Sequence, residues 1–222
     1  MADEQDLNLH QMDLLKKLAA IGSDLWGGMP SAAYEKEEVQ DRPREAPSAQ
    51  PPAKKKENAV HDLWKTADET VDWTDALAHD TPRDGLTGRR LWGFYHKMAE
   101  KVLAGDLEAY TEVLKTSNPL GELTDYANGI NMRAPGADCL ESTFTCKEEL
   151  MKENRKLYLA GMGLRIARDL LACMPVNEVK VMAVQDGKEV FSATYPRQQM
   201  THRNFAFIDP IRLAEELGAK YR

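Results

Sequence analysis

The sequence predicts an α+β fold: a helical N-terminal part, then an antiparallel four-stranded sheet of two hairpins, backed by a long central helix and a short C-terminal helix. Three observations predict it. Apolar residues recur at helical spacing up to residue 117, and period-two alternation appears after Pro119. An Asp-Gly dipeptide at 186–187 separates two β-rich runs. The second half should therefore run hairpin, helix, hairpin, helix.

The composition is that of a folded protein with one core. The chain has 222 residues, of which 42% are hydrophobic and 29% charged, close to globular averages. A formal net charge of −7 opposes the approach of nucleic acid and anionic lipid. No apolar run could span a bilayer, and Cys139, Cys146 and Cys173 form no C-x-x-C pair. We therefore expect a cytoplasmic protein with reduced thiols and with neither a membrane nor a nucleic-acid partner.

Residues 1–27 predict an amphipathic N-terminal helix. Alternating spacings of four and three residues create a coiled-coil-like seam, made of Leu7, Gln11, Leu14, Leu18, Ile21 and Leu25. Three heptads are marginal alone in water, so the helix needs a partner surface. That surface belongs to a protein partner, to a second copy of the chain or to its own domain. The candidate partner-binding residues are Leu7, Leu14, Leu18, Ile21, Leu25 and the aromatic anchor Trp26.

Residues 28–57 are expected to form a disordered linker. They are rich in proline, alanine, serine, glutamine and charge, so they cannot bury enough apolar surface to offset their ordering entropy. The remaining residues, 58–222, form the predicted α+β domain. Within it we expect helices over 58–117 and the hairpin, helix, hairpin, helix order over 118–222.

Three helices are expected before the sheet. Residues 58–79 carry apolar side chains at helical spacing, with Trp64 in the core. A second stripe covers 89–103. The third helix should begin after Asp106, a suitable N-cap, and should end before Asn118-Pro119, which leaves the α region.

The first hairpin is expected where residues 129–133 and 139–145 flank the stretch "APGAD". A long helix over 147–174 follows, and its small residues Gly161 and Gly163 should let it lie close to the sheet. The second hairpin joins "VKVMAV" to "EVFSATY" through "QDGK".

The last expected helix has signals at both ends. Asp209 is an N-cap, Pro210 occupies the first helical position, and Gly218 stops the helix.

Several short sequence motifs lie along the second half of the chain. Asn118-Pro119 opens the region, the run Arg-Ile-Ala-Arg-Asp at 165–169 precedes Pro175-Val176 and a strand, and Asp209-Pro210 closes it. With these markers, residues 105–215 resemble the C-terminal part of a large group of uncharacterised bacterial proteins, chiefly from Firmicutes. The resemblance implies no established activity, and it does not extend to the N-terminal helix and linker.

Asp138, Glu178 and Lys180 are candidates for a metal-dependent nuclease site. Nucleases of the restriction-endonuclease type hold a divalent metal with two carboxylates, one of them in an acid-x-lysine triplet. The competing explanation is structural. Asp138 follows a Pro-Gly turn, and alternation places Glu178 and Lys180 on the polar side of a half-exposed strand.

Arg165 and Arg168 are candidates for binding an anion, because their spacing brings the two guanidinium groups together on a helix. The alternatives are a solvated helix face, or a structural link in which Arg165 pairs with Asp169 while one arginine caps strand or loop carbonyls. The five histidines are scattered, so no metal site and no cofactor are expected.

These observations favour a non-enzymatic, cytoplasmic protein–protein interaction or regulatory module with a tethered helix that recruits a partner or self-associates. No dinucleotide, P-loop or nucleophile-elbow motif is present. Two alternatives stay open: the metal-dependent nuclease, and a structural subunit of a multiprotein assembly from a phage or a defence system.

Overall fold

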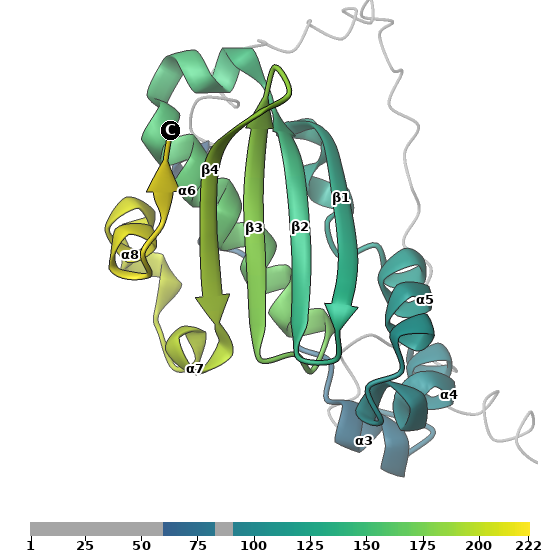
Figure 1. The fold of residues 1–222 in the computed structure, drawn as a ribbon. Coiled ribbons are helices and arrows are strands. Elements are labelled where there is room, and N and C mark those ends of the chain that lie inside the picture. Colours follow the sequence, from purple (N-terminus) through teal and green to yellow (C-terminus); the bar gives the residue numbers. More distant parts are fainter. Residues whose placement is uncertain (1–59, 83–90) are drawn as a thin grey trace, which may run out of the picture. The chain divides into compact units, whose positions relative to one another are not determined.

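A five-stranded sheet in the order β1-β2-β3-β4-β5 forms the centre of the fold (Figure 1). The structure is a computed structural model that describes residues 60–82 and 91–222. The predicted N-terminal helix and linker lie outside the described residues. The strands are β1 (Ala127–Gly136), β2 (Cys139–Cys146), β3 (Glu178–Gln185), β4 (Lys188–Pro196) and β5 (Lys220–Tyr221).

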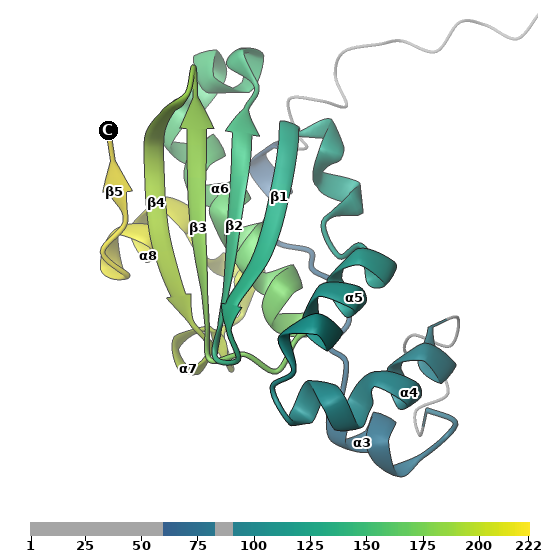
Figure 2. The same ribbon diagram turned by 45° about the vertical axis from the view of Figure 1, so that its right-hand side comes forward.

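One long helix, α6 (Glu148–Cys173), lies on one face of the sheet in both ribbon views (Figures 1 and 2). Over the described residues, no helix has the length and apolar character needed to cross a bilayer. The other helical elements are α3 (Trp73–Ala78), α4 (Trp92–Leu103), α5 (Leu107–Ser117), η1 (Gly121–Asp125), α7 (Arg197–Met200), η2 (Phe205–Phe207) and α8 (Pro210–Glu216).

The helix α6 approaches the sheet closely because Gly163 has no side chain. A Cβ at Gly163 would stand 2.7 Å from the Tyr195 hydroxyl and 2.9 Å from a ring atom of Phe191, both on β4. Asn154 leaves the helical region at φ −153° and ψ 89°, and its side chain accepts the Leu157 N–H at 3.1 Å. Asn154 therefore acts as an internal N-cap from which the buried part of α6 starts in a new direction.

The sheet is mixed, so the prediction of a four-stranded antiparallel sheet is wrong in two respects. Strands β2 and β3 are parallel, with Leu140 opposite Val179, and α6 is the crossover that connects them. Alternation within a strand reports which side chains share a face but not the direction of the neighbouring strand. The fifth strand, β5, is only two residues long and carries no periodic signal.

The predicted helix over 58–79 is also wrong, because only residues 60–62 and α3 are helical in this range. The backbone between them bonds to α6 instead. The Asp68 N–H donates to the Asp169 side chain at 2.9 Å, and the Val71 N–H donates to the Ala172 carbonyl at 2.9 Å. Tertiary hydrogen bonds have replaced helical ones in this segment, which we call the strap (residues 64–72).

Most other local predictions are confirmed. Asp106 and Asp209 accept backbone N–H groups at the starts of α5 and α8. Asp186 and Gly187 have φ values of 50° and 73°, as a type I′ hairpin turn requires. Trp64 is buried and donates its indole N–H to the Ile208 carbonyl at 3.0 Å.

Replacing Gly163 with alanine should destabilise the fold. Overpacking costs about 1–3 kcal/mol, whereas the gain in helix propensity is only about 1 kcal/mol. We expect the free energy of unfolding, measured by urea denaturation, to fall by up to about 2 kcal/mol.

Gly93→Ala in α4 is the matched control, because a Cβ there meets nothing within 4 Å. That variant should be as stable as the wild type or slightly more so. Equal stability of the two variants would contradict the close approach of α6 to β4.

Candidate functional site

The face of the sheet opposite α6 is uncovered over the described residues, as Figures 1 and 2 show. Strand register places its side chains in rows that cross the sheet. One row runs through Arg133, Glu141, Lys180 and Thr194. The next runs through Asn131, Thr143, Met182, Ser192 and Lys220. We call this surface the open face.

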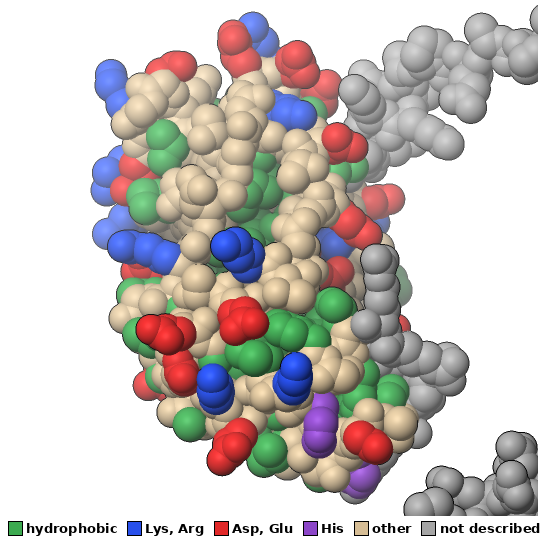
Figure 3. Space-filling model, turned by 90° about the vertical axis from the view of Figure 1, so that its right-hand side faces the viewer, with side chains coloured by type: hydrophobic (Ala, Val, Ile, Leu, Met, Phe, Trp, Pro, Cys, Tyr) green, Lys and Arg blue, Asp and Glu red, His purple; other side chains and the backbone are tan. Residues whose placement is uncertain are grey.

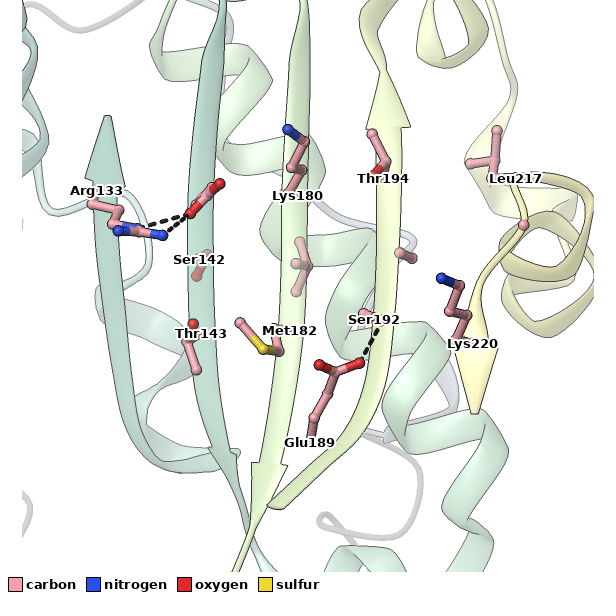
Figure 4. A pocket seen from close by; sticks show the side chains of 14 residues that line it. Arg133, Ser142, Thr143, Lys180, Met182, Glu189, Ser192, Thr194, Leu217 and Lys220 are labelled. Carbon is pink, nitrogen blue, oxygen red and sulfur yellow. Dashed lines mark hydrogen bonds and ion pairs between the residues drawn. The ribbon is translucent and has the colours of Figure 1, made fainter. Parts of the chain in front are cut away.

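A shallow depression of about 380 Å³ lies on the open face (Figure 4). The short side chains of Thr143 and Ser192 flank Met182 in it, and longer charged side chains surround them. The segment after α8 contributes one wall through Leu217 and Lys220. The depression therefore combines hydroxyl groups, one flexible apolar side chain and charges of both signs.

Most charged groups of the open face are already paired. The Arg133 Nε donates to Glu141 at 2.7 Å, and the Lys180 ammonium lies 3.2 Å from Glu178. Pairs as exposed as these contribute little stability, so a partner could exchange them at small cost. Lys220, by contrast, makes no ion pair within the described residues.

The Ser192 hydroxyl is the group on the open face closest to a reactive arrangement. It donates to the Glu189 carboxylate at 2.8 Å, and the same carboxylate lies 3.5 Å from Arg222. A serine nucleophile needs a base that is itself oriented by a third group. Here the group next to the serine is a carboxylate that is also ion-paired with Arg222, so the geometry suits recognition better than acyl transfer.

The structure brings the nuclease candidates to one end of the parallel β2–β3 pair. Asp138 immediately precedes Cys139, which lies opposite Glu178. The Asp138 carboxylate accepts the Asn177 side-chain amide at 2.8 Å, and Glu178 pairs with Lys180. In residues 60–82 and 91–222, no three histidine, cysteine or acidic side chains are grouped as metal ligands.

The anion candidates lie away from the open face, on the side of α6 that holds the strap. Arg165 is buried and its Nε donates to the buried Asp169 at 2.6 Å, the pairing that the helical spacing predicts. Arg165 also donates to the Thr66 hydroxyl and lies 3.4 Å from Glu122. Its guanidinium is thus occupied by protein groups.

Arg168 caps the strap from the same helix. Its Nη1 donates to the carbonyls of Trp64 and Thr66, the second at 3.1 Å. The strap is thus bonded to α6 through side chains of both arginines and of Asp169.

Burial raises the pKa of Asp169 to about 6, although its hydrogen bonds with Arg165 and the Asp68 N–H act in the opposite direction. The seam residues Leu7, Leu14, Leu18, Ile21, Leu25 and Trp26 lie outside the described residues.

Sequence reasoning missed most of the depression. The alternation along β3 predicts Glu178 and Lys180 on the polar side of the strand, and of these two Lys180 lines the depression. Ser192 and Lys220 carried no such signal, because their proximity to Met182 depends on strand order and on β5.

The side of the molecule next to β1 has a different character. Figure 3 shows charges of both signs over this side and hydrophobic side chains gathered in its lower part. Leu103 and Leu107, at the end of α4 and the start of α5, are large apolar side chains that remain exposed.

Stability should depend on pH through Asp169. The pKa is about 6 in the fold and 3.8 as a reference, so the folded state binds this proton more tightly. Its contribution is fully present below about pH 4 and is lost as the pH rises through about 6.

The measurement is the difference in unfolding free energy between wild type and Asp169→Asn, from urea denaturation between pH 4 and pH 7. This difference should decrease by roughly 3 kcal/mol with rising pH. An increase would show that Arg165 holds the Asp169 pKa below its usual range.

Comparison with known proteins finds no counterpart: no family model matches the chain, and neither a curated protein nor a solved structure does. The functional argument therefore depends on the geometry of the described residues and on the sequence.

Proposed function

We propose that this protein is a non-enzymatic protein-interaction module that binds partners through the open face and through the predicted N-terminal helix. The observation that carries the proposal is the uncovered sheet face, with its depression of about 380 Å³. Surfaces that bind proteins transiently are about as polar as the rest of a protein surface, with a small desolvated centre. The open face has this composition.

The chemistry of the depression indicates the kind of partner segment that fits. Met182 is unbranched and polarisable, so it adapts to varied apolar side chains. The hydroxyls of Thr143 and Thr194 can bond to main-chain groups of a bound segment. Lys220, which lacks a carboxylate partner in the described part of the chain, would attract an acidic residue.

We also propose a cytoplasmic location and a bacterial origin for the protein. The three cysteines are free thiols, which suits a reducing compartment such as the cytoplasm. The resemblance of residues 105–215 to bacterial proteins supports a bacterial origin. A subunit of a phage or defence assembly would differ from the interaction module only in the identity of the partner.

Met182→Arg should remove partners of the open face, because it places an unpaired charge at the centre of the depression. Tagged full-length protein is used to capture partners from cells, and each partner is quantified by mass spectrometry. We expect an open-face partner to decrease by at least about tenfold, the effect of about 1.4 kcal/mol.

Gln198→Arg is the control, since it makes the same charge change at an exposed position of α7. If Met182→Arg captures the same partners, in the same amounts, as the wild type and this control, binding at the open face is contradicted.

The predicted seam makes a separate prediction for the N-terminal helix. Leu14→Glu should place a carboxylate within it and abolish assembly. Light scattering on full-length protein reports whether the molar mass exceeds the 25.0 kDa of one chain, and capture from cells reports recruited partners.

Leu9→Glu introduces the same charge outside the seam and should leave both measurements unchanged. If Leu14→Glu also leaves both unchanged, the helix has no role in assembly.

A further inference from the structure

A second depression, of about 310 Å³, lies beside the C-terminal half of α6 and is separate from the open face. The strap forms one wall through Asp68 and Thr70, and the region of α7 and η2 forms the opposite wall. Arg168 and Arg197 both line it. This volume corresponds to a site for a small molecule.

Protein groups hold the Arg168 guanidinium in place without neutralising it. Its central carbon lies 4.0 Å from the centre of the Phe205 ring, and Nη1 donates to the Trp64 and Thr66 carbonyls. Nε and Nη2 have no hydrogen-bond acceptor in the described residues. They remain available to a ligand.

Arg197 is held in the same way at the end of α6. Its Nε donates to the Val176 carbonyl at 2.6 Å, and Nη2 donates to the carbonyls of Leu171 and Met174 at 2.7 and 2.5 Å. Nη1 has no acceptor within residues 60–82 and 91–222.

Both arginines therefore differ from Arg165. Over the described residues, neither Arg168 nor Arg197 lies within 4.0 Å of a carboxylate, whereas Arg165 pairs with Asp169. Two fixed guanidinium groups with free N–H donors match the geometry of an oxyanion. The hydroxyl of Thr70 and the apolar side chains of Met200 and Phe205 complete the lining.

We propose that this depression binds a small organic anion, with its oxyanion group on Arg168 and Arg197 and its apolar part against Met200 and Phe205. The oxyanion is a phosphate or a carboxylate, which share this recognition chemistry. Asp68, the carboxylate in the lining, opposes the ligand charge and so limits its affinity.

Calorimetric titration of the full-length protein at constant ionic strength tests the site, with inorganic phosphate, phenyl phosphate and benzoate as probes. We expect one binding event per chain, tighter for phenyl phosphate or benzoate than for inorganic phosphate. Tighter binding of phenyl phosphate would identify the oxyanion as a phosphate, and tighter binding of benzoate would identify it as a carboxylate.

Variants locate the binding event. Arg168→Gln should weaken it by about tenfold or more, the loss of a charge-assisted hydrogen bond. Asp68→Asn should strengthen it. The variant keeps the hydrogen bond from the Asp68 backbone N–H to Asp169 and loses only the 3.9 Å ion pair of the Asp68 carboxylate with Arg165. This second variant decides the question if Arg168→Gln does not fold. Arg212→Gln, at an exposed position of α8, should bind as the wild type does.

Two results would overturn the site. One is the absence of heat from all three probes with wild-type protein. The other is binding that Asp68→Asn leaves unchanged, or that Arg212→Gln weakens as much as Arg168→Gln does.

Discussion

Gly163 brings α6 so close to β4 that a Cβ there would stand within 3 Å of the Tyr195 hydroxyl and of the Phe191 ring, and the rest of the structure depends on this contact. Since β2 and β3 are parallel, their connection must cross the sheet, and a helix is the usual solution. The crossover helix packs on one face and leaves the other uncovered over the described residues. The open face is thus a consequence of the topology.

The opposite side of α6 is held by buried charged groups in addition to apolar packing, which here includes the Trp64 ring against Gly161. A buried ion pair such as Arg165–Asp169 gains little net stability, because desolvation offsets most of the attraction. Removing only one of the two residues strongly destabilises the fold, since the charge of the other residue is then buried without a partner. This asymmetry favours one position of the strap over others. The strap in turn forms a wall of the depression that holds Arg168 and Arg197.

The sequence predicts a helix, strand or turn well where adjacent residues alone determine its conformation. The Asp186-Gly187 turn, the Asp209 N-cap and the period-two strands each depend on a few adjacent residues. The prediction of a helix over the strap was wrong because the hydrogen-bond partners of the strap lie about a hundred residues away, on α6. The depression on the open face was missed for the same kind of reason: Met182 and Lys220 become neighbours only through strand order.

Net charge is a property of the whole chain, and it does not describe the two surfaces that we propose for recognition. The formal charge of −7 argues against broad polyanion binding. Yet Arg168 and Arg197 are held by carbonyl oxygens, which orient a guanidinium without cancelling its charge and leave some of its N–H donors free. On the open face, in contrast, carboxylates neutralise Arg133 and Lys180. We therefore propose the small anion at the two arginines that carbonyl dipoles hold, and the protein partner at the open face, where carboxylates hold the cations.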